Sequence, residues 1–178
     1  MKRQWLDSVK WREIQESVPI VCVDILPVQL LRDDFKTIGA VGLIMRETPH
    51  QGQRWCLIGG RLGRNESLHD AIIREIRDAL GNDLYFTVKE DIQPDFVAEY
   101  FTVPGDNVCF DPRQHAIGLT FCIPITGNIH PQGEAILFEW FNTFQLPPNK
   151  DFGFDQDRVV AACLKKSVWR LKSPGGSL

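Results

Sequence analysis

One segment constrains the fold more than any other: a glycine-punctuated loop that runs directly into an amphipathic helix. The loop reads GGRLGRNES from Gly59, and the residues that follow, up to Leu80, repeat apolar side chains at helical spacing. Gly81 stands where a helix end prefers glycine. A strand is expected just before the loop, over residues 54–58. This order of strand, loop and helix predicts a helix that packs on a sheet.

The helix has one continuous apolar face, which must be buried. Its members are Leu68, Ala71, Ile72, Ile76, Ala79 and Leu80. The same spacing puts Glu75 inside this apolar sector, with Asp78 on its flank, while Arg74 points away toward Asp70 and Arg77. A carboxylate that faces a core is costly unless a metal or another cation compensates its charge. Glu75 is therefore a candidate metal ligand; the alternative is that it lies at the edge of the apolar face and pairs with an arginine.

Arginines are concentrated around this segment. The chain of 178 residues has a formal net charge of -3, but six of its arginines lie between Arg46 and Arg77, where there is no lysine. Arginine makes bidentate contacts with oxyanions, so the bias favours phosphate or carboxylate chemistry, with a solvated face as the alternative. The acidic balance of the whole chain argues against nucleic-acid binding.

The remaining pattern predicts one domain with more strands than helices. Further strands are expected over residues 20–26, 37–46, 84–88, 96–103, 116–125 and 135–141, and further helices over 3–16 and 158–171. We expect an N-terminal helix within residues 1–17, a domain over 18–172 and a flexible tail over 173–178. A mixed sheet between helices, in the α+β class, is the simplest architecture for this pattern.

The cysteines and the N-terminal residues indicate a compartment. The five cysteines form no CxxC pair and are odd in number, which argues against a zinc site and against a disulfide framework. The first residues include no apolar run of the kind found in secretion signals, and no stretch reaches the roughly 20 apolar residues of a membrane helix. A cytoplasmic protein is expected.

From Gly60 the chain resembles the Nudix box, G-x5-E-x7-R-E-U-x-E-E-x-G-U, in which U is a bulky aliphatic residue. The matching positions are Gly60, Glu66, Arg74, Glu75, Ile76 and Gly81, and Asp78 replaces the first of the paired glutamates. Ala79 replaces the second glutamate and Asn82 the closing aliphatic residue, so the box is degenerate. The resemblance to the Nudix hydrolase superfamily implies an α/β/α sandwich with a mixed sheet between helices.

The resemblance also implies an activity and roles for residues. Nudix enzymes hydrolyse nucleoside diphosphates linked to another group and use Mg2+ or Mn2+. By this resemblance the Gly59 carbonyl and the Glu75 and Asp78 carboxylates hold the metal, while Glu66 pairs with Arg74 to brace the loop against the helix. Such chemistry needs a hard cation on oxygen ligands, because a diphosphate repels a nucleophile and leaves as an anion. Glu75 and Arg74 are therefore candidates for the catalytic machinery.

Ala79 removes a carboxylate that is usually a metal ligand in this superfamily. Glu134, in a loop later in the chain, is the candidate replacement, either as a metal ligand or as the catalytic base; the alternative is an ordinary loop glutamate. The same departure motivates a second function class, a catalytically impaired domain that binds a nucleotide or nucleotide sugar as a sensor or interaction module.

Beyond the box, the chain looks most like the GDP-mannose mannosyl hydrolase branch, in which water attacks the sugar carbon. The segment SVPIVCVDIL puts Asp24 at a substrate-contacting position, and MRETPHQGQRWCLIGGRL puts Arg46 and Arg61 at phosphate-binding positions. The base histidine of that branch falls at Ala135. This resemblance implies a GDP-mannose-like nucleotide sugar as the substrate. It leaves two roles open for the N-terminal helix, which either mediates a homodimer or covers its own sheet.

Overall fold

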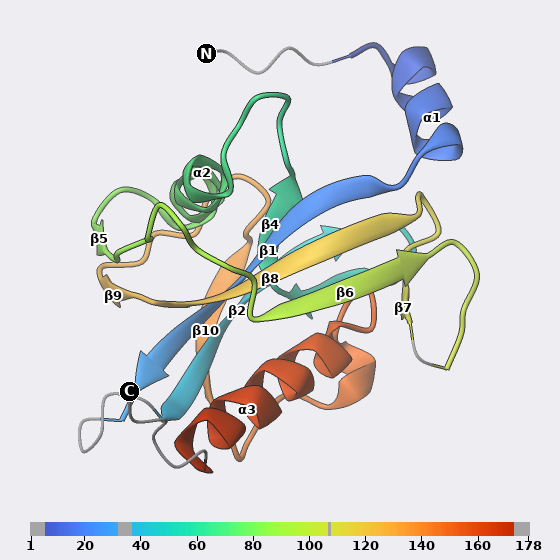
Figure 1. The fold of residues 1–178 in the computed structure, drawn as a ribbon. Helices are drawn as coiled ribbons and strands as arrows, with labels where there is room; N and C mark the ends of the chain where they lie inside the picture. The colour runs from blue at the N-terminus through green and yellow to red at the C-terminus, as the bar shows by residue number, and fades with distance from the viewer. Residues whose placement is uncertain (1–5, 32–36, 107, 173–178) are drawn as a thin grey trace, which may run out of the picture.

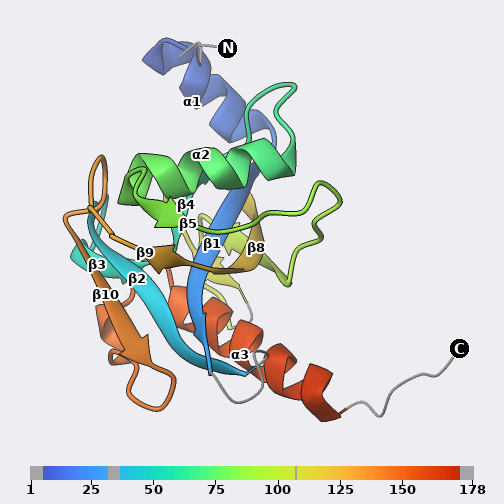
Figure 2. The same cartoon turned by 90° about the vertical axis from the view of Figure 1, so that its left-hand side faces the viewer.

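The protein folds into a mixed sheet between helices, as expected. The computed structural model describes residues 6–31, 37–106 and 108–172; the expected tail at 173–178 lies outside these residues. Figures 1 and 2 show α2 on one face of the sheet and α3 on the other. The elements are α1 (Ser8–Ser17), β1 (Ile20–Leu30), β2 (Ile38–Thr48), β3 (Gly52–Cys56), β4 (Ile58–Arg61), α2 (Leu68–Leu80), β5 (Leu84–Tyr85), β6 (Phe96–Phe101), β7 (Cys109–Phe110), β8 (Ala116–Pro124), β9 (Thr126–Gly127), β10 (Leu137–Asn142), a 3-10 turn (Asn149–Asp151) and α3 (Gln156–Lys172).

The strands pair in the order β10-β2-β1-β8-β6-β7, with β3 on β2 and β4 on β1. The β1–β8 and β6–β7 pairs are parallel and the other pairs of this sheet are antiparallel. Apolar side chains of β1, β2 and β8 fill the core together with those of α2; the largest that are fully buried include Phe121, Ile25, Leu26 and Leu43. The core thus supports β1, the strand that pairs with β2, β4 and β8.

β1 does not end at Pro27, where the sequence predicts a boundary, but continues to Leu30. Proline lacks the N–H group that a central strand donates to its neighbour. On one side β1 pairs with β4 up to Ile25, and from Val28 onward it pairs with β2. Pro27 falls between these two partners, where a missing donor breaks no ladder bond on that side.

The glycine-punctuated loop begins later than expected, because Gly59, Gly60 and Arg61 belong to β4. This strand is antiparallel to β1, and its register places Gly59 opposite Asp24. The helix that follows agrees with the expectation at both ends. Ser67 accepts a hydrogen bond from the Asp70 backbone N–H at 3.0 Å, and Gly81 closes the helix with a φ of 90°. The loop therefore carries the chain from β4 to the start of α2.

The N-terminal helix α1 begins at Ser8, and Asp7 caps it; residues 1–5 lie outside the described part of the chain. None of its side chains is fully buried, but Trp11 and Ile14 pack partly against the core. Leu6 and Val9 are exposed. The homodimer remains a prediction. Across the described residues, no helix is both long and apolar enough to cross a membrane.

Candidate active site

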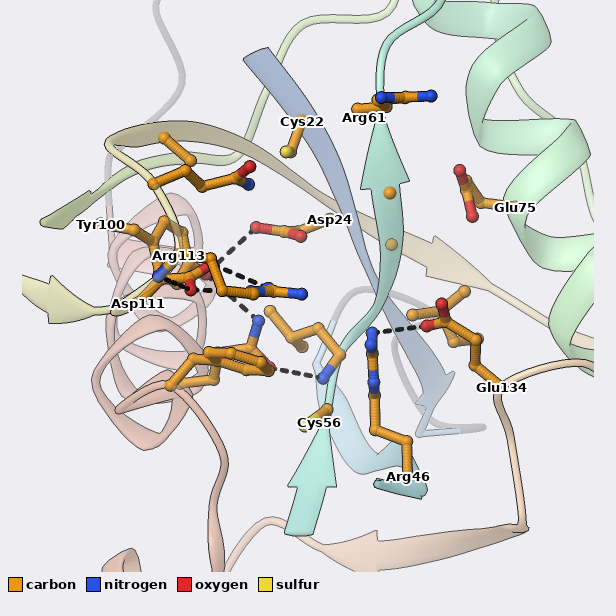
Figure 3. A pocket seen from close by; sticks show the side chains of 18 of the residues that line it. Cys22, Asp24, Arg46, Cys56, Arg61, Glu75, Tyr100, Asp111, Arg113 and Glu134 are labelled. Carbon is orange, nitrogen blue, oxygen red and sulfur yellow. Dashed lines mark hydrogen bonds and ion pairs between the residues drawn. The ribbon is translucent and has the colours of Figure 1, made fainter. Parts of the chain in front are cut away.

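A cavity of about 770 Å³ is lined by residues of β1, β4, α2 and α1. Figure 3 shows side chains of β1, β2, β4 and α2 around it. Eight of the predicted site residues contribute to its lining, namely Asp24, Arg46, Gly59, Gly60, Arg61, Glu75, Asp78 and Glu134, and so does Ala79. Glu66, Arg74 and Gly81 do not line the cavity but belong to the loop and helix behind it. The fold therefore gathers the predicted substrate and metal residues in one place.

Arg74 lies behind this wall and holds the loop to the helix. Its guanidinium donates to Glu66 from Nε at 2.5 Å and from Nη2 at 2.9 Å. It also donates from Nη1 to Glu75. The prediction that Arg74 points away from Glu75 is wrong, because the long guanidinium reaches both carboxylates from its place on α2. The hydrogen bond with Glu66 is the main cause of a raised pKa of Arg74, so the guanidinium stays charged.

Glu75 projects from α2 toward β4, and its side chain is only 12% exposed. Its carboxylate lies so close to the Gly60 backbone that a side chain at position 60 would displace it. Glycine at that box position thus lets the Glu75 carboxylate lie directly against the strand. The arginine-paired alternative for Glu75 agrees with its contact to Arg74. That contact keeps the carboxylate at the cavity wall, where it remains a candidate ligand.

Asp24, on β1, lies next to Gly59 of β4 and is buried, with 7% of its surface exposed. It accepts a hydrogen bond from the Tyr100 hydroxyl at 3.1 Å, and that hydroxyl accepts one from Gln156 Nε2 at 3.2 Å. Gln156 Oε1 in turn accepts from the Leu57 backbone N–H at 2.9 Å. Burial raises the pKa of Asp24 to about 7; the Tyr100 hydrogen bond opposes this, and the charge of Glu75 adds to it.

Arg46 reaches the cavity from β2 and pairs with Glu134 at 2.7 Å (Figure 3). The Arg46 side chain is 16% exposed, whereas that of Glu134 is 69% exposed. Among the residues that the structure describes, Arg46 Nε is a buried nitrogen without a hydrogen-bond partner. A buried donor without a partner is costly, so this nitrogen is suited to an acceptor on a ligand. The role of Glu134 as ligand or base remains a prediction.

A third arginine in the cavity, Arg113, is not singled out by the sequence. It holds the buried Asp111 through two hydrogen bonds of 2.8 Å, and its guanidinium lies 5.0 Å from the centre of the Phe154 ring. Arg46 lies 5.9 Å from the same ring centre. The available signal was the polar run from Asp111 to Gln114 directly before a buried strand. Tyr100 and Gln156 are also new, and no local pattern marks them.

Oxygen donors for a divalent cation lie along one wall of the cavity. Glu75 and Asp78 are three residues apart on α2, and Gly59 adds a backbone carbonyl at the same cavity. The charge of Glu75 also acts on Asp24, and a cation near both would relieve that repulsion. In the described part of the chain, no three acidic, histidine or cysteine side chains already form a cluster suited to a metal ion. The donor chemistry nevertheless fits Mg2+ or Mn2+.

Comparison with known protein families identifies the family of this chain. A domain of unknown function (DUF4916) matches residues 1–163. The chain belongs to this family. No curated protein matches the DUF4916 chain.

Solved structures give the fold of this DUF4916 protein. A protein from Jonesia denitrificans, described as a possible asymmetric diadenosine tetraphosphate (Ap4A) hydrolase, is 28% identical, with a TM-score of 0.77 over 89% of this chain and 99% of that one. A MutT/Nudix family protein from Enterococcus faecalis is 17% identical, with a TM-score of 0.63 over 93% and 76%. An ADP-ribose pyrophosphatase from Streptococcus suis is 17% identical, with a TM-score of 0.52 over 90% and 97%. The Nudix fold expected from the box is thus confirmed, and the likeness supports a hydrolase.

Proposed function

We propose that this protein is a divalent-metal-dependent hydrolase of a nucleoside diphosphate derivative. One observation carries the proposal: two carboxylates of α2, Glu75 and Asp78, line the same cavity as Arg46 and Arg61. Carboxylates suit a hard cation, and arginines suit the oxygens of a diphosphate. A site for hydrolysing a phosphate ester or anhydride needs both, because the leaving group is an anion.

In this proposal, each residue of the Nudix-box segment at the cavity has a distinct role. Glu75, Asp78 and the Gly59 carbonyl would hold Mg2+ or Mn2+, which would neutralise charge on the diphosphate when bound. Arg74 is a positioning residue, because it fixes Glu75 to the loop through Glu66. Its ion pair with Glu66 keeps the Glu75 carboxylate against β4 before any ligand enters.

The arginines on the facing side would bind the diphosphate. Arg46 has a buried Nε without a partner among the described residues, and its pairing with the exposed Glu134 is easily exchanged for a phosphate oxygen. Arg61 follows Gly60 at the end of β4 and contributes a second guanidinium. Asp24, on the adjacent strand, would contact the group linked to the diphosphate.

The favoured substrate class is a nucleotide sugar resembling GDP-mannose. The support is the resemblance of the segments around Asp24, Arg46 and Arg61 to the GDP-mannose mannosyl hydrolase branch. The names of two similar structures mention Ap4A and ADP-ribose, which also contain linked phosphates on a nucleoside. These are the two competing substrate classes for a first assay.

The test is to incubate the pure protein and Mg2+ with GDP-mannose, ADP-ribose and Ap4A, and to follow the products. Hydrolysis of GDP-mannose faster than of the other two would support the full proposal. Preference for ADP-ribose or Ap4A would support the hydrolase and reject the sugar nucleotide. Binding without turnover of any of them would reject the hydrolase in favour of a binding module. Reaction in 18O-labelled water then locates the cleaved bond, since the label enters either the sugar or the phosphate.

A further inference from the structure

The helix α1 contributes to the cavity, although none of its residues is fully buried. Trp11, Arg12, Gln15 and Glu16 contribute to the cavity lining. Most stabilisation of a protein helix comes from burying an apolar face. Since α1 buries little, its contacts at the cavity are its most specific connection to the rest of the protein.

One of these contacts is between Trp11 and Arg61. The Arg61 guanidinium lies 4.0 Å from the centre of the Trp11 ring, which is the distance of a close cation–π contact. A guanidinium that stacks through its planar face keeps its N–H groups at the edge. Arg61 can therefore contact a phosphate and an aromatic ring at the same time. This arrangement places an indole next to the position proposed for the diphosphate.

Two side-chain amides lie in the same part of the cavity. Gln15 Nε2 of α1 donates to Gln114 Oε1, in the turn before β8, at 2.8 Å. Both residues line the cavity, and both are partly buried. This bond does not use the Gln15 oxygen or the Gln114 nitrogen, so the pair presents one acceptor and one donor. Amide pairs of this kind suit the polar edge of a nucleobase.

We infer that Trp11, with Gln15 and Gln114 beside it, forms the subsite for the nucleobase of the substrate. The base stacks on the Trp11–Arg61 pair, and the amides contact its edge. This inference rests on the proposed function for its diphosphate, but it adds the residue that binds the base. It also gives α1 a role in substrate selection.

The test compares a ligand that has a base with one that has none. Calorimetric titrations of the whole chain with GDP and with inorganic pyrophosphate, both with Mg2+, are made for wild type and Trp11→Ala. Stacking on one aromatic ring corresponds to roughly a 5- to 150-fold change in affinity. We expect the affinity for GDP to fall about 10-fold or more in Trp11→Ala and that for pyrophosphate to stay within twofold. Trp11→Phe should keep most of the affinity for GDP.

Controls separate stacking from other effects. Val9→Ala changes an exposed residue of the same helix outside the cavity lining, and it should leave both affinities unchanged. Gln114→Ala should change the ratio of the affinities for GDP and ADP without changing that for pyrophosphate. Thermal unfolding of each variant shows that the fold is intact, because Trp11 is only partly buried.

Three results would overturn the base subsite. One is a Trp11→Ala variant that binds GDP as wild type does. Another is an equal loss for GDP and pyrophosphate, which would limit Trp11 to positioning Arg61. The third is a wild-type protein that binds neither ligand. If wild type binds GDP through Trp11 but hydrolyses no nucleotide derivative, the hydrolase proposal fails while the base subsite stands.

Discussion

Two acidic residues on the same cavity, Glu75 and Asp24, are held in opposite ways. Glu75 pairs with the guanidinium of its neighbour Arg74, which also binds Glu66, eight residues earlier in the loop. The charge of Glu75 is therefore compensated by a residue close in the sequence. Asp24 is buried deeper, and its hydrogen-bond partner is the neutral hydroxyl of Tyr100, 76 positions away. The two carboxyls therefore differ in their partners, a charged guanidinium for Glu75 and a neutral hydroxyl for Asp24, although both line one site.

This difference shows how one cavity supplies two kinds of carboxyl group. An ion-paired carboxylate stays charged and suits a cation. A carboxyl whose pKa lies near 7 can gain or lose a proton under physiological conditions, and environments that separate two acids in this way are common in enzyme sites. Four experiments test how differently Glu75 and Asp24 are held.

The largest effect is expected from Asp24→Asn. The unfolded chain loses the Asp24 proton near pH 3.8, whereas the folded protein keeps it until about pH 7. Between these values the folded state holds more protons, so this residue lowers stability as the pH rises. Relative to wild type, Asp24→Asn should gain stability from pH 4 to pH 8, by up to about 4 kcal/mol. Urea unfolding at several pH values measures the gain.

Asp91→Asn, at an exposed position, is the matched control. Its free energy of unfolding relative to wild type should not rise between pH 4 and pH 8. A flat difference between Asp24→Asn and wild type over the same range would show that Asp24 titrates like an exposed carboxyl. The contrast with Glu75 would then fail.

The second effect concerns activity. Glu75→Gln keeps the shape of the side chain but removes the negative charge that a cation needs. Changes even to residues that only support metal ligands cost about 10- to 100-fold, so kcat should fall by about 100-fold or more. Steady-state assays over a series of Mg2+ concentrations measure it. Glu139→Gln, at an exposed position of β10, is the control. A kcat within threefold of wild type would remove Glu75 from the site's machinery.

The third effect tests the ion pair itself. Arg74→Ala leaves Glu66 and Glu75 without their shared cation, at side-chain exposures of 18% and 12%. Breaking a hydrogen-bonded, partly buried charge pair should lower the free energy of unfolding by about 2 to 3 kcal/mol. Arg77→Ala, on the exposed side of the same helix, should change it by less than about 0.5 kcal/mol. Equal losses in urea unfolding would show that Arg74 does not brace the loop.

The smallest effect is expected for Glu134→Gln. Glu134 is 69% exposed, and exposed ion pairs contribute roughly 0 to 1 kcal/mol, so its pair with Arg46 should change the free energy of unfolding by less than about 0.5 kcal/mol. A loss above 1 kcal/mol in urea unfolding would place Glu134 among the structural ion pairs, together with Arg74.

The surroundings of Glu75 can be predicted well from the sequence, because its interactions are with residues close in the chain. Glu66, Arg74 and Glu75 lie within ten residues, and helical periodicity with a serine cap and a terminal glycine fixes α2. The direction of Arg74 was nevertheless mispredicted, since position on a helix does not determine where a long guanidinium ends. The limits of β4 were also missed, because its pairing with β1 depends on a distant strand.

The surroundings of Asp24 are harder to predict, because its contacts join distant parts of the chain. Tyr100 comes from β6 and Gln156 from the start of α3, and neither position has a motif of its own. The same holds for Trp11 at the cavity edge: the chain has 18 aromatic residues, and only the packing of α1 shows which one meets Arg61. Tertiary contacts of this kind appear only when the strand order is known.

Along β1 the pairing partner on one side changes from β4 to β2. The residues at the cavity therefore differ in how freely their side chains can be substituted. Up to Ile25, β1 has β4 and β8 on its two sides, so the β1 residues at the cavity, Cys22 and Asp24, lie in the middle of three paired strands. Trp11 lies at the edge of the cavity on α1, outside these three strands. Substitutions of Trp11 can therefore change which molecules are accepted without disturbing the strands. Relatives with this architecture should diverge in substrate first at this position.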